Sequence, residues 1–198
     1  MLTECYNNSM SWKNDQVSAE ETTTILKAAE KTLTTPGDWV EFGCYKGDTS
    51  LSLANILHTH HSDKHLWLYD SFEGLPTKTQ QDQPEVNPEF QPGSLATSKR
   101  ELKLRFLRAN LPLPIIKKAW FADLAPDGLP IQISFAFLDS DFYESIKTSL
   151  ELIVPRLTPN AVIVIHDYHN AKLPGVARAV DELIESKSSL SSQKLILL

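Results

Sequence analysis

The sequence ISFAFLDSDFYES, residues 133–145, decides the fold together with AVIVIHDYHN, residues 161–170. Each segment opens with an apolar run rich in β-branched residues, which predicts a buried strand. Side chains that follow the carboxyl ends of neighbouring parallel strands converge on one crevice. The groups expected to meet there can bind a metal or move a proton, and they are Asp139, Asp141, His166 and Asp167.

The composition excludes several classes of protein. The 198 residues match one α/β domain, and a net charge of -6 without a basic stripe argues against nucleic-acid binding. Cys5 and Cys44 lie far apart, as expected of two reduced thiols. No segment approaches the roughly 20 apolar residues of a membrane span, and the polar N-terminus does not resemble a secretory signal. The sequence therefore predicts a cytoplasmic protein without a membrane partner, and it leaves the oligomeric state open, a homodimer included.

Helical and extended patterns alternate along the chain. A capping box at Ser18 and Glu21 begins the first predicted helix, and Pro36 and Gly37 end it. Strands are expected at residues 39–43, 66–69, 114–121, 133–138 and 161–165, helices between them, and an edge strand from Gln193. Such alternation implies parallel strands with right-handed crossovers. The predicted fold is α/β, Rossmann-like and doubly wound, with a mostly parallel sheet and helices on both faces.

The chain divides into an arm, residues 1–17, and a single domain, residues 18–198. Within that domain, residues 71–93 are rich in Pro, Gln, Thr and acidic side chains and show no period. A loop of this length inside a compact domain is usually a lid, a binding loop or a disordered segment. We expect a lid. The seven glycines are all expected outside the predicted helices.

The first strand leads into EFGCYKG, which contains Glu41, Gly43 and Gly47 before a helix. Glycine at a strand end lets a ligand approach the backbone, and a helix N-terminus favours a polar or anionic group. The spacing is neither that of dinucleotide-binding loops nor that of a P-loop, and a tight turn without a ligand is an equal reading. Asp70 ends the second strand, where a carboxylate can hold a ribose diol, although it could also stabilise a turn. Together these residues favour a nucleoside pocket without a pyrophosphate site, which suits S-adenosylmethionine better than NAD.

Five segments in register resemble the macrocin O-methyltransferase (TylF-like) family. They are LYDSFEGLP (68–76), AWFAD (119–123), FLDSDFYES (137–145), VIHDYHN (164–170) and PGVARAVDEL (174–183). The resemblance implies a class I methyltransferase fold, S-adenosylmethionine and, usually, a divalent metal such as magnesium. By position, the methionine end of the cofactor would lie against Glu41, Gly43 and Gly47. The ribose would lie at Asp70, with Ser71 and Phe72 beside it. Trp120 and Phe121 would flank the adenine, although Phe121 could instead belong to the core. Asp123 is a weaker candidate for contact with the exocyclic amine of the adenine.

The resemblance also implies a metal site with one departure. Asp139 matches the family's aspartate after the fourth strand, which would also contact the cofactor. His166 and Asp167 stand where the family has two aspartates. Magnesium prefers oxygen ligands, whereas imidazole suits zinc, iron, nickel or manganese. The site could bind magnesium weakly, could prefer a softer metal, or could work without metal with His166 as general base.

Other polar residues have plainer interpretations. Asp141 is predicted to cap the helix that begins near Tyr143, and His169 to lie in a surface loop. His58, His60, His61 and His65 are predicted to lie in a solvated connector rather than a metal site.

The expected function is transfer of a methyl group from S-adenosylmethionine to a hydroxyl of a small metabolite, with a sugar of a glycosylated product as the acceptor. Asp139 and His166 are the expected catalytic residues. Two rivals remain: a non-catalytic S-adenosylmethionine-binding protein with a degenerate metal site, and a nicotinamide oxidoreductase.

Overall fold

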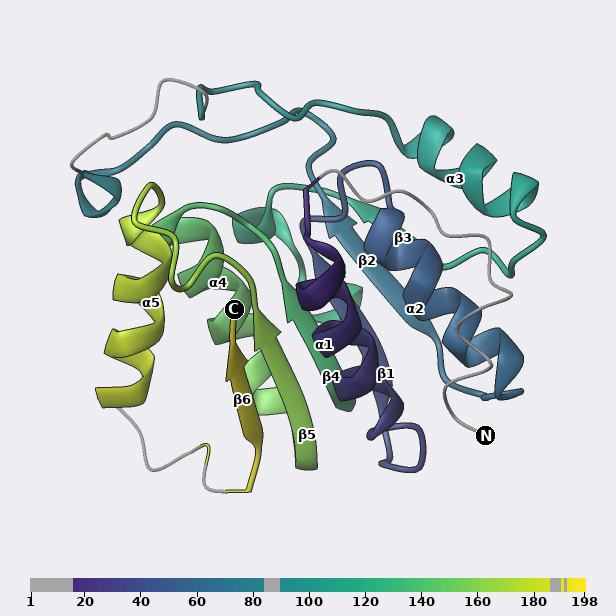
Figure 1. The fold of residues 1–198 in the computed structure, drawn as a ribbon. Coiled ribbons are helices and arrows are strands. Elements are labelled where there is room, and N and C mark those ends of the chain that lie inside the picture. Colours follow the sequence, from purple (N-terminus) through teal and green to yellow (C-terminus); the bar gives the residue numbers. More distant parts are fainter. Residues whose placement is uncertain (1–15, 84–89, 186–189, 191) are drawn as a thin grey trace.

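A computed structural model describes residues 16–83, 90–185, 190 and 192–198. Most of the predicted arm and the centre of the predicted lid lie outside these residues. Six parallel strands form one sheet in the order β3-β2-β1-β4-β5-β6 (Figure 1). The strands are β1 (Asp38–Phe42), β2 (Leu66–Asp70), β3 (Ile115–Lys118), β4 (Ile133–Leu138), β5 (Leu157–Ile165) and β6 (Lys194–Leu197). The predicted edge strand near the C-terminus is β6.

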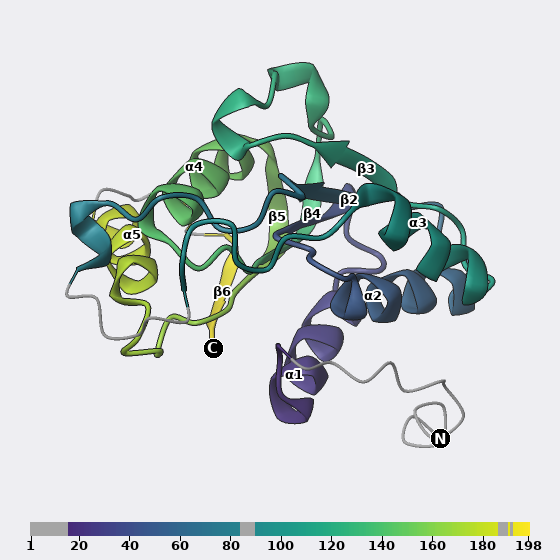
Figure 2. The same cartoon turned by 90° about the horizontal axis from the view of Figure 1, so that it is seen from above.

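In the described part of the chain, five α-helices cover the two faces of the sheet (Figure 2). They are α1 (Ala19–Glu30), α2 (Asp48–Thr59), α3 (Lys99–Arg108), α4 (Tyr143–Ile153) and α5 (Pro174–Glu185). Successive strand residues face opposite ways: Trp39 packs with α1, α2 and α3, and Val40 packs with α4 and α5. Because every central strand has an apolar layer on each side, its residues form the continuous apolar runs read from the sequence. The predicted doubly wound α/β fold is confirmed.

The strand order places a switch point between β1 and β4. The chain proceeds from β1 to β2 and β3 in one direction and then returns to add β4 on the other side of β1. At the carboxyl ends of these two strands, the Asp139 N–H donates to the Phe42 carbonyl oxygen at 2.9 Å. Open α/β sheets bind ligands at such a point because the following loops diverge there.

The helix starts confirm one cap prediction and overturn another. Ser18 and Glu21 form the predicted capping box: the Glu21 N–H donates to Ser18 Oγ at 3.2 Å, and the Ser18 N–H donates to Glu21 Oε2 at 3.0 Å. The predicted Asp141 cap of α4 is wrong. Phe142 is the N-cap residue, and the Tyr143 N–H donates instead to Asp82 Oδ1 at 2.8 Å. A carboxylate from the loop after β2 therefore replaces the local cap.

Gly175 lies in the first turn of α5, although the sequence predicted glycines only outside helices. A Cβ at this position would lie 2.0 Å from Asp82 Oδ1. A glycine here lets the loop after β2 dock against the N-terminal ends of α4 and α5. Among the described residues, no helix combines the length and hydrophobicity needed to cross a membrane.

Candidate active site

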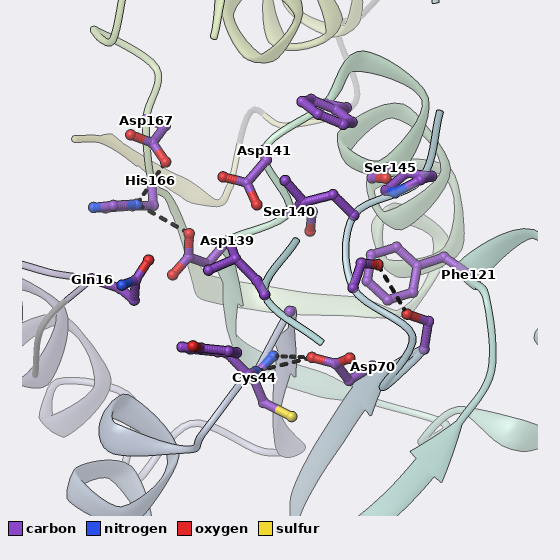
Figure 3. Close-up of a pocket in the computed structure, with 18 of the residues that line it drawn as sticks. Gln16, Cys44, Asp70, Phe121, Asp139, Ser140, Asp141, Ser145, His166 and Asp167 are labelled. Atoms are coloured by element: carbon purple, nitrogen blue, oxygen red, sulfur yellow. Dashed lines mark hydrogen bonds and ion pairs between the residues drawn. The ribbon is translucent and has the colours of Figure 1, made fainter. Parts of the chain in front are cut away.

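A cavity of about 390 Å³ lies beyond the carboxyl ends of the central strands. This volume falls within the usual range for small-molecule sites. Its wall includes most of the residues predicted from the sequence: Glu41, Gly43, Gly47, Asp70, Ser71, Trp120, Phe121, Asp139, His166 and Asp167. Figure 3 shows Asp139, Asp141, His166 and Asp167 grouped on one side, with Cys44 and Asp70 on another. The fold thus brings the two predicted halves of the site into one cavity.

The glycine turn between β1 and α2 is shaped by close backbone contacts. Gly43 has φ +82°, and a Cβ there would lie 1.8 Å from the Asp139 carbonyl oxygen. Gly47 has φ +84°, and its Cβ would lie 2.2 Å from Leu102 Cδ1 of α3. Both positions disfavour any larger residue, since the conformation is strained for L-residues and the space is filled.

The Asp70 carboxylate holds this turn against β2. Oδ2 accepts from the N–H groups of Cys44 and Tyr45 at 3.0 and 2.9 Å, and Oδ1 accepts from the Phe72 N–H at 2.6 Å. The turn-stabilising role considered from the sequence is therefore present. Asp70 also lines the cavity, and a carboxylate has about four acceptor sites, so it keeps capacity for a ligand.

Glu41 lies beneath the turn and is only 1% exposed. The Ser50 hydroxyl of α2 donates to its Oε2 at 2.6 Å. Burial, reinforced by the charges of Asp139, Asp70 and Asp48, raises the pKa of Glu41 to about 8, although the Ser50 bond opposes this. The carboxyl is therefore largely protonated at neutral pH.

The two predicted aromatic residues differ in packing. Phe121 stands edge-on to Phe42 with ring centroids 5.1 Å apart, so it belongs to the core and also lines the cavity. Trp120 is 36% exposed and lines the cavity. Phe72 is buried in the core with α1, α2 and α3, and neither Phe72 nor Asp123 is part of the cavity wall.

His166 is the centre of the polar cluster at the ends of β4 and β5. Its Nδ1 lies 3.0 Å from Asp139 Oδ1 and 3.0 Å from Asp167 Oδ2. Its Nε2 lies 3.7 Å from Glu21 Oε1, on the first turn of α1. The Asn170 amide donates to Asp167 Oδ1 at 2.8 Å and so fixes that carboxylate. Among the described residues, Asp139, His166 and Asp167 form a group whose ligand atoms lie within 4.8 Å of one another.

The charges in this cluster shift several pKa values. Burial opposes a charged imidazole, but the bonds to Asp139 and Asp167 outweigh it and raise the pKa of His166 to about 11. Burial likewise opposes the Asp167 carboxylate, yet the bond and charge of His166 lower the pKa of Asp167. Desolvation, followed by the charges of Asp139 and Asp167, raises the pKa of Asp141 well above its ordinary value. One imidazole therefore does not compensate all the carboxylates around it.

Sequence reasoning missed the parts of the site that come from distant segments. Asp141, which the sequence placed both among the groups at this crevice and at the cap of α4, has φ +60° and lines the cavity. Gln16 and Val17 precede α1 and line it too, as does Asp82. Only Asp141 carried a local signal, since it lies two residues beyond Asp139 at a strand end. The predicted surface histidines, His58, His60, His61, His65 and His169, are all exposed.

The fold and the cavity together define a doubly wound α/β protein with a ligand site at its switch point, in which a glycine turn faces a carboxylate–histidine cluster. The family model of macrocin-O-methyltransferase (TylF) matches residues 20–191, and the chain belongs to this family.

Relatives and solved structures agree with this assignment. The chain is 32% identical over 140 residues to an 8-demethyl-8-(2,3-dimethoxy-alpha-L-rhamnosyl)-tetracenomycin-C 4'-O-methyltransferase of Streptomyces olivaceus, covering 67% of this chain and 53% of that protein. It is 27% identical over 153 residues to the demethyldecarbamoylnovobiocin O-methyltransferase of Streptomyces niveus, covering 74% and 58%. The structure of the O-methyltransferase NovP shares the fold, with a TM-score of 0.71 and 24% identity over 83% of this chain and 71% of that one. The chain thus spans somewhat more than half the length of the curated relatives it matches.

Proposed function

We propose that this protein transfers a methyl group from S-adenosylmethionine to a hydroxyl of a small metabolite, a sugar of a glycosylated natural product. The observation that carries the proposal is the shared cavity, in which the glycine turn and the Asp139–His166–Asp167 group lie at the carboxyl ends of neighbouring strands. Family membership supports the reaction class. The relatives whose names specify sugar-bearing acceptors support the acceptor class.

The cofactor would occupy the side of the cavity formed by the glycine turn. Gly43 and Gly47 leave backbone accessible there, and Asp70 has acceptor capacity for ribose hydroxyls. Ser71 lines the same side, and Trp120 and Phe121 offer aromatic faces for adenine. Glu41 lies where the amino group of the methionine portion would be, and a cation there would favour its ionised form. S-adenosylmethionine supplies a methyl group on a sulfonium, which is activated for displacement.

The acceptor hydroxyl would lie beside the polar cluster. Two carboxylates and an imidazole within ligand distance of one another fit a divalent metal, which would lower the pKa of a hydroxyl it binds. Asp139, His166 and Asp167 would hold that metal. Since the pKa of His166 is already raised by its carboxylate neighbours, the imidazole suits a charged or metal-bound role better than that of a free base.

Asp141 is the group we assign to accept the hydroxyl proton. It lines the cavity within the cluster, and its pKa is raised well above that of an ordinary carboxyl by desolvation and by Asp139 and Asp167. Asp139, which bonds His166, would position that side chain and the acceptor rather than carry the proton.

The loop after β2 would act as a lid over the acceptor. Its described parts, residues 71–83 and 90–98, lie above the carboxyl ends of the strands (Figure 1). Its base is closed by two backbone bonds, from Leu75 N–H to the Ser94 carbonyl at 2.8 Å and from Gly93 N–H to the Leu75 carbonyl at 2.9 Å. The far side is held by Asp82 on α4. Segments held at these two places can exclude water from the acceptor.

Turnover on defined acceptors tests this function. The protein would be incubated with S-adenosylmethionine, a panel of deoxysugar glycosides and either EDTA or a divalent metal, and S-adenosylhomocysteine would be quantified. Asp141→Asn should lose transfer, whereas Asp127→Asn, at an exposed position outside the cavity, should not. Tight S-adenosylhomocysteine binding without transfer to any acceptor would support the non-catalytic alternative instead.

A further inference from the structure

We propose that Asp139, His166 and Asp167 select a nitrogen-accepting divalent metal over magnesium, and that Glu21 sets this preference by orienting His166. The proposal deepens the function proposed above, because the same group would hold the acceptor hydroxyl. It concerns which metal this particular donor set takes and which residue outside the set controls it.

The first step is the identity of the nitrogen that faces the carboxylates. His166 Nδ1 lies 3.0 Å from an oxygen of each of Asp139 and Asp167, so all three donor atoms point toward one region. Ligand atoms about 2.1 Å from a metal at right angles to one another would be about 3 Å apart, so this spacing suits a shared ion. The imidazole is only 8% exposed and has little room to turn its other nitrogen inward.

The second step is the contact on the opposite side of the ring. Nε2 faces Glu21 Oε1 at 3.7 Å, within ion-pair range. The Glu21 carboxylate is itself held, because its Oε2 accepts the Ser18 N–H at 3.0 Å in the capping box of α1. A metal held by the two aspartates would replace the proton on Nδ1, and the Glu21 carboxylate would then keep the remaining ring proton on Nε2. Glu21 is therefore a positioning residue that makes Nδ1 the ligand atom.

The third step is the chemistry of the donors. Magnesium prefers an all-oxygen octahedral shell that retains several waters, whereas manganese, cobalt and zinc accept imidazole readily. A site with one nitrogen and two carboxylate oxygens should therefore bind these metals much more tightly than magnesium. The ordinary affinity order already favours them, so the informative quantity is how that preference changes when the nitrogen is removed.

Calorimetric titration measures this change in metal preference. The full chain is titrated separately with Mg²⁺, Mn²⁺, Co²⁺ and Zn²⁺, without cofactor or acceptor. His166→Asp should weaken Co²⁺ and Zn²⁺ binding by about tenfold or more and strengthen Mg²⁺ binding. His61→Asp makes the same change at an exposed turn outside the cavity and should leave all four affinities unchanged. Equal metal preference in wild type and His166→Asp would overturn the proposal.

Nitrogen-15 NMR of the histidine ring tests the orientation directly. On Zn²⁺ binding, His166 should keep the proton on Nε2 and show a metal-bound Nδ1. Glu21→Gln retains a side-chain acceptor for the helix cap but loses the charge facing Nε2, and it should weaken Zn²⁺ binding by about tenfold. Glu20→Gln, on the same helical turn but exposed, is the matched control. Metal binding through Nε2, or a Glu21→Gln variant with wild-type affinity, would contradict the positioning role.

The two proposals fail in different ways. If wild type binds none of the metals and His166 keeps both ring protons, the metal preference is wrong, while S-adenosylhomocysteine binding and methyl transfer can still be measured. If the metals bind as expected but neither the cofactor binds nor a methyl group is transferred, the proposed function is wrong and the metal site stands.

Discussion

The cavity has two polar walls. The first wall is the glycine turn with Asp70, and the second consists of Asp139, Asp141, His166 and Asp167. The two walls differ in how far hydrogen bonds and charges within the protein compensate their polar groups. In the first wall, the Asp70 carboxylate accepts three backbone N–H groups and Glu41 is held neutral by burial. In the second, the Asp139 and Asp167 carboxylates share the His166 imidazole, and desolvation, followed by the charges of these two carboxylates, raises the pKa of Asp141. In the first wall, groups of the protein itself compensate the carboxyl groups. The second wall has an excess of negative charge that a cation would relieve. The contrast indicates a preformed binding surface facing a reactive one.

The largest effect should come from removing one charge from the second wall. Asp139→Asn keeps the shape of the side chain but removes the carboxylate facing His166 Nδ1, and methyl transfer should fall by about 10²-fold or more because the acceptor loses its positioning. Binding of S-adenosylhomocysteine, measured by calorimetry, should stay near the wild-type value because the first wall is untouched. Retained turnover would place the reaction centre elsewhere.

The next effect concerns the contact that joins the two walls. Gly43→Ala would drive a Cβ to within 1.8 Å of the Asp139 carbonyl oxygen, which belongs to backbone and cannot turn aside. The free energy of unfolding in urea should fall by about 3 kcal/mol or more. Gly93→Ala provides a matched control, because Gly93 has the same φ of +82° with nothing within 4 Å of its Cβ. That variant should lose only about 1 kcal/mol of unfolding free energy, because its alanine is strained at this φ but meets no neighbour. Equal losses in the two variants would mean that the close approach is unimportant.

A smaller effect should follow from opening the first wall. Asp70→Ala removes the acceptor of the Cys44, Tyr45 and Phe72 N–H groups. Cofactor affinity should weaken by roughly 1.5–3 kcal/mol for each charged hydrogen bond lost to the ligand. Calorimetry with S-adenosylhomocysteine, with the exposed Asp127→Ala as control, measures the change. An unchanged affinity would show that Asp70 only stabilises the turn.

The last expected effect is a change in the pH dependence of stability. The pKa of Glu41 is raised on folding from 4.5 to about 8, so the folded protein retains a proton that the unfolded chain releases. The contribution of this group to stability therefore falls as the pH rises from about 4.5 to about 8 and is constant above that. Glu41→Gln cannot ionise and should lose this part of the slope.

Urea unfolding of wild type and Glu41→Gln at about pH 5 and about pH 8.5 checks the sign. The free energy of unfolding of Glu41→Gln should rise relative to that of wild type as the pH rises. Glu151→Gln, at an exposed position of α4, should follow wild type at both values. A difference of the opposite sign would mean that Glu41 is ionised in the folded protein.

The strands and most site residues could be predicted from sequence because their signals are local. Apolar runs at β4 and β5 end at Asp139 and His166, and parallel topology then requires these ends to be neighbours. Phe72 shows the limit of such reasoning. It follows Asp70 closely in the chain, yet its ring is buried in the core with residues of α1, α2 and α3, and its backbone has φ +56°.

The sequence alone determined the alternation of strands and helices, the glycine turn after β1 and the polar residues at the ends of β4 and β5, because periodicity and strand-end position are properties of short segments. Only the tertiary structure decided that Asp82, rather than Asp141, accepts the first N–H of α4 and that Glu21 faces His166. Each of these depends on where the loop after β2, the turn after β4 or the helix α1 packs. Such contacts join residues distant in sequence, and no local pattern specifies them.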